Sequence, residues 1–235
     1  MMNKRRLEDL VQEHALGSKQ QLSPENFIQS FRITEETSVL IDYLDEREQQ
    51  RVKELTHTPR RHAYITSHAL TRILLTLTLD RDMPPKSWKI DYNSRGKPSV
   101  SENIYFNISY AEDICIIAIS TQGQIGIDIT QSTPIENADL PWFVLHPQEI
   151  DLLQEIAPEK RYQRFLEMWT YKEAVAKAIG LGFDLEFNCI NSTKIQMQYQ
   201  ELTLLITQQA LSLGNKHYHY ALAHIHTPQR IQNVS

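Results

Sequence analysis

Residues 123–130 read GQIGIDIT, an isoleucine-rich run with the alternation of a β-strand. Successive side chains of a strand point to opposite faces, so the isoleucines share one face while Gly126, Asp128 and Thr130 share the other. Aspartate has poor β-propensity, and burying its charge is costly unless a partner offsets it. We therefore expect a cationic group at Asp128, and we favour a functional role over an ordinary capping or paired aspartate.

The composition narrows the class of protein. Of 235 residues, 41% are hydrophobic and 23% are charged, which fits a globular chain of one or two domains. Lysine and arginine number 24 against 29 acidic residues, so the basic excess of nucleic-acid-binding proteins is missing. Cys115 and Cys189 lie among apolar residues and a GxxxxGK loop is absent, which disfavours a disulfide scaffold, a cysteine zinc site and a P-loop. No apolar run approaches the roughly 20 residues of a spanning helix, and the polar start is not typical of a signal peptide, so we expect a cytoplasmic protein.

Hydrophobic periodicity divides the chain into an arm and two halves. Residues 1–26 are polar and predict a loosely attached arm or a short helix. Residues 27–122 and 123–235 each mix helices with short antiparallel-type strands, so we predict an α+β chain of two similar halves that join near Gly123. The expected helices lie at residues 40–55, 60–79, 147–155 and 160–179. The expected strands lie at residues 88–92, 105–109, 114–120, 123–130, 186–190, 193–199, 202–206 and 217–225.

The predicted helix at residues 160–179 carries charged residues beside an apolar stripe. At about 100° per residue, one face gathers Phe165, Met168, Trp169, Val175, Ala176 and Ile179. Lys172 falls at the centre of that stripe, where it could extend its ammonium past the apolar surface. Glu173 and Lys177 project together from one border, where the alternative is an ordinary surface ion pair. A carboxylate and two lysines beside an apolar seam, with Asp128 elsewhere on a strand, would suit a magnesium ion and a pyrophosphate.

Four segments resemble, in order and separation, the motifs of the surfactin-type 4′-phosphopantetheinyl transferases. They are RGKP (residues 95–98), FNISYAED (106–113), IGIDIT (125–130) and WTYKEAVAKAIGLGF (169–183), and the resemblance extends from about Leu40. It implies an α+β pseudo-dimer whose halves enclose coenzyme A at their junction. It also implies a monomeric cytoplasmic enzyme that transfers the phosphopantetheine group of coenzyme A to a serine of an apo acyl or peptidyl carrier protein and releases 3′,5′-ADP. Such carriers serve fatty-acid, polyketide or nonribosomal-peptide synthesis, and neither nucleic acid nor membrane takes part.

The resemblance also implies roles for individual residues. Asp128 and Glu173 would hold the Mg²⁺ that binds the pyrophosphate, and Glu173 would also accept the serine proton. Lys177 and Lys172 would neutralise charge on the phosphates as the bond breaks. The remaining contacts with coenzyme A, including its 3′-phosphate, would come from Arg51, Arg95, Lys97, Ser109 and Tyr110.

Two residues depart from the family pattern. Many members carry a second acid where this chain has Thr130, so we expect water to complete the Mg²⁺ shell. Tyr110 stands where the motif usually has a histidine, and because tyrosine brings no positive charge near neutral pH, we expect weaker coenzyme A binding but an intact reaction. These departures leave open a catalytically weak relative that docks carrier proteins without modifying them. A metal-dependent phosphatase that uses Asp128 and Glu173 is a third reading.

Overall fold

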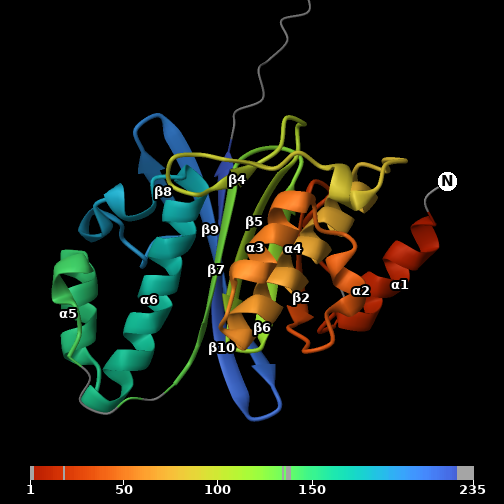
Figure 1. Ribbon diagram of the computed structural model, residues 1–235. Coiled ribbons are helices and arrows are strands. Elements are labelled where there is room, and N and C mark those ends of the chain that lie inside the picture. The colour runs from red at the N-terminus through yellow and green to blue at the C-terminus, as the bar shows by residue number, and fades with distance from the viewer. Residues whose placement is uncertain (1–2, 18, 134, 136–138, 227–235) are drawn as a thin grey trace, which may run out of the picture.

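The computed structural model describes residues 3–17, 19–133, 135 and 139–226, which form two halves of sheet and helix (Figure 1). The N-terminal half is built on a four-stranded antiparallel sheet in the order β1, β2, β6, β5. Its strands are β1 (Gln20–Ser23), β2 (Asn26–Arg32), β5 (Tyr105–Ala111) and β6 (Ile114–Ser120). Its helices are α1 (Lys4–His14), α2 (Ser38–Ile41), α3 (Glu46–Glu54) and α4 (Thr58–Thr78).

The C-terminal half repeats this plan with a sheet in the order β7, β10, β9, β8. Its strands are β7 (Ile125–Gln131), β8 (Gln196–Tyr199), β9 (Leu202–Leu213) and β10 (Lys216–His226), and its helices are α5 (Pro147–Glu155) and α6 (Pro158–Ile179). The N-terminal half also contains a small hairpin of β3 (Asp91–Tyr92) and β4 (Pro98–Ser99). The remaining elements are short 3₁₀ helices, namely η1 (Pro85–Ser87), η2 (Trp142–Val144), η3 (Gly182–Asp184) and η4 (Phe187–Cys189). Among the described residues, every helix is too short or too polar to cross a bilayer.

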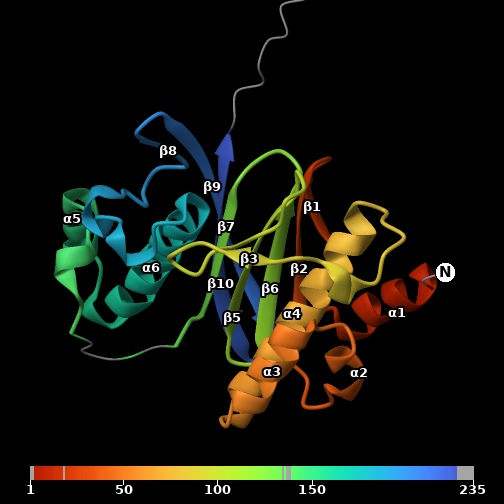
Figure 2. The same cartoon turned by 45° about the horizontal axis from the view of Figure 1, so that its top comes forward.

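The fold has four layers, in the order helices, sheet, sheet and helices, and apolar side chains fill the three spaces between them. Figures 1 and 2 show the two sheets together in the centre, with α1 to α4 on one outer side and α5 and α6 on the other. One buried cluster, which includes Ile73, packs the helices of the N-terminal half on their sheet, and another, which includes Val175, does the same for the C-terminal half. The third joins Ile116 of β6 to the isoleucines of β7. The predicted α+β pseudo-dimer is therefore confirmed.

Side chains of β5 connect the two halves at their junction. The Asn107 Oδ1 accepts a hydrogen bond of 2.9 Å from the backbone N–H of Ile127, and the Ser109 Oγ accepts one of 3.3 Å from the N–H of Ile129. Each acceptor replaces a neighbouring strand's carbonyl, which a buried backbone N–H otherwise requires. These two hydrogen bonds therefore fix the position of β7, and of Asp128 on it, relative to β5.

Gly126 lets α6 lie directly against β7. A Cβ at this position would lie closer than 3.0 Å to backbone atoms of Ala174 and Ala178. Because strand side chains alternate, Asp128 lies on the same face of β7 as Gly126 and hence faces α6. The missing side chain thus sets the distance between the strand aspartate and the charged residues of the helix.

The N-terminal segment forms a short helix, which is one of the two predicted alternatives, and this helix is packed against the core instead of loosely attached. α1 buries Leu7, Leu10 and Val11 in the same cluster as Ile73 of α4. β1 pairs with β2 in the N-terminal sheet. Three apolar side chains on one helix face are enough to attach a polar segment to a core. Residues 3–17 and 19–26 therefore belong to the N-terminal half.

Three other predicted elements differ from the structure. The strand expected at residues 88–92 is reduced to β3 (Asp91–Tyr92). The helix expected at residues 40–55 is divided into α2 and α3, because Asp45 starts α3 with a capping box in which its Oδ1 accepts from the Glu48 N–H at 2.8 Å. Residues 187–189 of the strand expected at 186–190 form η4 instead. The chain passes from the N-terminal sheet to the C-terminal sheet between β6 and β7, and this connection contains Gly123, the predicted junction. The exact division into 27–122 and 123–235 stays our proposal.

Candidate active site

Asp128 meets a lysine and a serine at the junction of the halves. The Lys177 Nζ donates to the Asp128 Oδ1 at 2.6 Å and to the Ser109 Oγ at 3.1 Å, and the Ser109 Oγ donates to the same Asp128 oxygen at 2.8 Å. These three groups come from α6, β5 and β7. The prediction of a cationic partner for the strand aspartate is confirmed, and the partner is Lys177.

Glu173 lies one turn before Lys177 on α6 and is half-buried beside Asp128. Burial raises the pKa of the Glu173 carboxyl, the charge of Asp128 raises it further, and Lys177 opposes both effects. Among the hydrogen bonds and ion pairs of the described residues, none involves the Glu173 side chain. Two carboxylates therefore lie close enough to repel each other, and one of them is available to a ligand.

The donor set fits a magnesium ion that a phosphate ligand shares. Across the described ranges, no three His, Cys, Asp or Glu side chains are grouped as a metal site. Mg²⁺ is usually bound by one or two carboxylates, with waters and substrate phosphates as further ligands. Asp128 and Glu173 would supply the carboxylates, and the Thr130 hydroxyl lies on the same strand face as Asp128.

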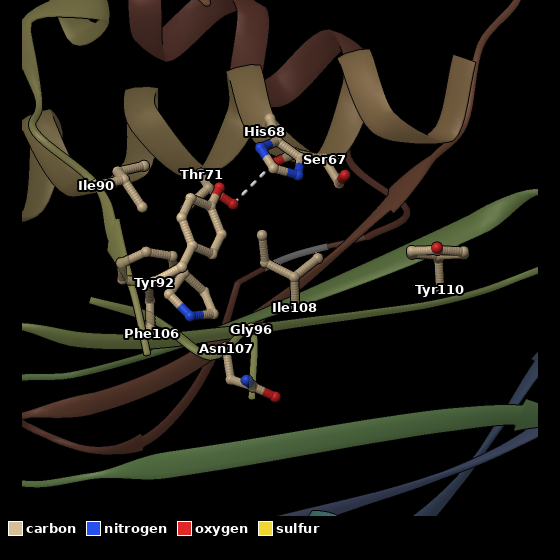
Figure 3. A pocket seen from close by; sticks show the side chains of 11 residues that line it. Ser67, His68, Thr71, Ile90, Tyr92, Gly96, Phe106, Asn107, Ile108 and Tyr110 are labelled. Carbon is tan, nitrogen blue, oxygen red and sulfur yellow. Dashed lines mark hydrogen bonds between the residues drawn. The ribbon is translucent and has the colours of Figure 1, made fainter. Parts of the chain in front are cut away.

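A groove of three adjoining cavities leads to Lys177, the partner of Asp128. The outer cavity, of about 340 Å³, includes Arg47 and Arg51; the middle one, of about 180 Å³, lies below α4; the inner one, of about 230 Å³, includes Lys177. The outer and middle cavities share His68 and Tyr92. The middle and inner cavities share residues 96, 98, 107 and 108. We call these three cavities the α4 groove, and Figure 3 shows its middle part.

Besides Lys177, four of the residues expected to contact coenzyme A line the α4 groove. Arg51 lies at the outer cavity and pairs with Glu54 at 3.0 Å, and Tyr110 lies at the middle cavity with half of its surface exposed. Arg95 and Lys97 come from the hairpin of β3 and β4 and line the inner cavity. A fifth, Ser109, binds Asp128 as described above. Their contacts with coenzyme A stay predictions.

The hairpin also ties the N-terminal half to the end of α6. The Lys97 Nζ donates to the Ala178 carbonyl at 2.6 Å, and Arg95 forms an ion pair with Asp184. Burial lowers the pKa of Lys97 to about 8. Both cations therefore lie beside the inner cavity, with the Lys97 ammonium at the negative end of the α6 helix dipole.

The expectation that Lys172 contacts phosphate is wrong. Its side chain is fully buried in the C-terminal half, where the Nζ lies 2.8 Å from Glu149 of α5 and donates to the carbonyls of Phe187 and Ile190. Burial lowers the pKa of Lys172, and Glu149 partly offsets this shift. The apolar stripe of α6 is the face that packs into the core, so a lysine at its centre is buried with it. Lys172 thus holds α5 and η4 against α6.

The structure adds groove residues that the sequence did not single out. They are Arg47, Ser67, His68, Thr71, Tyr92 and Asn107. For Asn107 a signal existed, since Asn107 and Ser109 are alternate polar residues in a β-rich segment and share one face. The others come from α3, α4 and the short strand β3, where the sequence shows no motif, and only folding brings them together.

Comparison with known proteins shows one family to which part of this chain is similar. Residues 124–227 match a family profile described as the 4′-phosphopantetheinyl transferase superfamily. A 4′-phosphopantetheinyl transferase of Nostoc sp. is 34% identical over 106 residues, which are 42% of this chain and 44% of the relative. One from Aneurinibacillus migulanus is 37% identical over 106 residues, which are 45% of this chain and 44% of the relative.

A third relative covers more of the chain. A Synechocystis protein provisionally named for the same activity is 31% identical over 144 residues, which are 59% of this chain and 58% of the relative. The chain thus spans about half the length of these curated relatives. Over residues 124–227, this chain is thus similar to the 4′-phosphopantetheinyl transferase superfamily.

Proposed function

We propose that this protein transfers the 4′-phosphopantetheine group of coenzyme A to a serine of an apo carrier protein and releases 3′,5′-ADP. The observation that carries the proposal is that Asp128 and Glu173 lie beside Lys177, which lines the inner cavity of the α4 groove. Two carboxylates with an adjacent lysine suit a pyrophosphate and its metal ion. The outer and the inner cavity of the α4 groove both contain lysine or arginine side chains that could bind phosphate groups.

The transfer reaction requires that the protein position coenzyme A and the serine and that one of its groups accept the serine proton. The serine oxygen forms a bond to the phosphorus that bears pantetheine, the bond from that phosphorus to 3′,5′-ADP breaks, and the serine proton passes to Glu173 directly or through water. Because burial and the charge of Asp128 raise the pKa of Glu173 from its ordinary value, Glu173 is a stronger base than an exposed glutamate. Lys177, and the groove cations Arg95 and Lys97, would offset charge on the phosphates. Mg²⁺ held by Asp128 and Glu173 would polarise the pyrophosphate.

The direct test is a mass measurement on a panel of carriers. The protein is incubated with coenzyme A, Mg²⁺ and apo acyl or peptidyl carrier proteins, and we expect a carrier to gain the mass of phosphopantetheine. No gain with any carrier that still binds the protein would favour a docking relative. Cleavage of coenzyme A without a carrier would favour a phosphatase.

A cytoplasmic location and a monomeric state also stay predictions, which fractionation and light scattering would check.

Thr130→Glu should leave transfer intact and lower the Mg²⁺ concentration that it requires. The new carboxylate would lie on the same face of β7 as Asp128 and would add a charged oxygen ligand where the native hydroxyl is weak. The measurement is the initial rate of carrier modification against Mg²⁺ concentration. Thr130→Gln is the matched control, because it has similar length without charge. A higher Mg²⁺ requirement in Thr130→Glu would contradict this role.

Binding of 3′,5′-ADP should weaken as the pH rises through about 8, where Lys97 loses its charge. The folded pKa lies below the ordinary lysine value, so the ammonium is present below about pH 8 and absent above it. We expect the Kd to rise by up to about tenfold per pH unit, measured by calorimetry. In Lys97→Arg the dependence should flatten, because arginine stays charged. An equal slope in both proteins would assign the effect to another group.

A further inference from the structure

The side chain of Asn93 stabilises the turn between β3 and β4. Its Oδ1 accepts hydrogen bonds from the backbone N–H groups of Arg95 and Lys97, each at 2.9 Å. The Asn93 carbonyl accepts from the Gly96 N–H at 2.9 Å, and the Asn93 N–H donates to the Lys97 carbonyl at 3.0 Å. Asparagine is common in turns because its side chain can bind the backbone that follows it. One amide group thus fixes the conformation of residues 93–97.

The same amide group reaches the end of α6 in the C-terminal half. Its Nδ2 donates to the Gly180 carbonyl at 3.2 Å. A Cβ at Gly180 would lie 3.3 Å from this nitrogen, so the turn packs directly on the residue that ends the helix. Figure 2 shows the hairpin of β3 and β4 extending from the side of α4 to α6. The Asn93 oxygen therefore binds the turn, and its nitrogen binds the other half.

These contacts join the two walls of the inner cavity. Residues 95–98 of the hairpin line one wall, and residues 176, 177, 180 and 182 line the other. Asn93 and Lys97 bind the carbonyls of Gly180 and Ala178, at a helix end whose last carbonyls have no partner within the helix. Asn93 lines none of the three cavities of the α4 groove. Among the described residues, it thus joins the walls without facing the space between them.

Only an amide side chain can perform both parts of this role. An aspartate could accept the two bonds within the turn, but its carboxylate could not donate to the Gly180 carbonyl. An alanine could do neither. The neighbouring Ser94 is exposed, and among the side-chain hydrogen bonds of the described residues none involves it. Substitutions at Ser94 therefore alter the same turn without altering its contact with α6.

We infer that Asn93 is a positioning residue, which holds the turn against the end of α6 and so keeps the Lys97 ammonium at the inner cavity to bind a phosphate group. The identity of the ligand as coenzyme A rests on the proposed function, but the contact between the turn and α6 does not. The Lys97 side chain is long and flexible, and its bond to the Ala178 carbonyl requires that the turn stay close to α6. Without Asn93, we expect Lys97 to extend into solvent.

This role predicts a change in the pH dependence of binding as well as in affinity. In the native protein, burial lowers the pKa of Lys97 to about 8. The charged groups nearest to it are Lys177 of α6, Arg95 of the turn and Asp184 of η3, and a substitution of Asn93 changes none of them. In solvent, the pKa of Lys97 should rise toward the ordinary lysine value. A variant should therefore lose most affinity below pH 8, because above it the wild type also lacks the Lys97 charge.

The test measures the Kd of 3′,5′-ADP by calorimetry at about pH 7 and about pH 9, on either side of the Lys97 pKa. In Asn93→Ala and Asn93→Asp, the Kd at the lower pH should rise about three- to tenfold, which is the effect of one hydrogen bond. The KM for coenzyme A should rise equally, while kcat stays within about twofold because Asp128 and Glu173 are unchanged. At the higher pH, the ratio of variant to wild-type Kd should fall toward one.

Two substitutions of the neighbouring residue are the matched controls. Ser94→Ala should bind 3′,5′-ADP as the wild type does. Ser94→Asp measures the effect of an added charge alone, so Asn93→Asp should weaken binding more than Ser94→Asp. Four results would overturn the inference: no binding to the wild type, unchanged affinity in both Asn93 variants, an equal loss in the Ser94 controls, or a loss that is the same at both pH values. The last result would indicate a general loosening of the hairpin.

The outcome is separable from that of the proposed function. If the wild type and its variants show this pattern of 3′,5′-ADP binding but no carrier is modified, the transferase is refuted and the positioning role stands. If the wild type modifies carriers and Asn93→Ala keeps the wild-type KM, the positioning role is refuted and the transferase stands.

Discussion

Glu173→Gln should reduce phosphopantetheine transfer by at least about a hundredfold while the protein stays folded. The substitution removes the proposed proton acceptor and one of the two Mg²⁺ carboxylates but keeps the size of the side chain. In the native protein, burial and the charge of Asp128 raise the pKa of Glu173, so the ionised carboxylate costs stability at neutral pH. The neutral amide should therefore leave the melting temperature unchanged or slightly higher. The measurements are initial rates by carrier mass and a thermal melt.

The matched control is Glu167→Gln on the same helix. Glu167 pairs with Arg164 at 2.5 Å and lines none of the three cavities of the α4 groove. Transfer should continue at the wild-type rate in this control. Full activity in Glu173→Gln would remove the carboxylate pair from the reaction, whereas loss of activity in both variants would point to an effect on α6 as a whole.

Gly126→Ala should prevent the C-terminal half from folding correctly. The added methyl group would collide with backbone atoms of Ala174 and Ala178, so no rearrangement of a side chain can relieve it. Overpacking of a core usually costs about 1–3 kcal/mol, and a collision with helix backbone should exceed that range. We expect insoluble protein, or soluble protein with a far lower melting temperature and no transfer.

Gly214→Ala is the graded control for this substitution. Gly214 has a φ of 59°, and a Cβ there would meet no atom within 4 Å. Its cost is therefore backbone strain alone, about 1 kcal/mol, and the protein should fold and remain active. Ala178→Gly should fail to rescue Gly126→Ala, because the atoms in collision belong to the backbone. Rescue by this change, or normal stability of Gly126→Ala alone, would show that α6 can move away from β7.

Periodicity in the sequence was sufficient for most elements of the fold. The alternation in β7 and the helical stripe of α6 both correspond to observed elements, because each pattern spans several turns or repeats. The attachment of α1 could not be predicted, since three apolar residues in a polar segment have meaning only when a partner surface is present. η4 was mistaken for a strand because a short apolar run fits either conformation.

The sequence predicted a site residue where that residue is energetically unfavourable in its element. A charged residue in an isoleucine strand required a cation, and the structure supplies one. Ser67, His68 and Thr71 of α4 gave no such signal, because serine, threonine and histidine are ordinary on a helix. That they line one cavity with residues of β3 and β5 is visible only in three dimensions.

The sequence by itself determined that Asp128 needs a positive partner and that α6 carries two candidates, Lys172 and Lys177. Five residues of an α-helix separate these lysines by about 140° around the helix axis, so one helix cannot present both to the same strand. Only the tertiary structure decided between them. Gly126 admits α6 against β7 in one orientation, which brings Lys177 to Asp128 and buries Lys172 against Glu149.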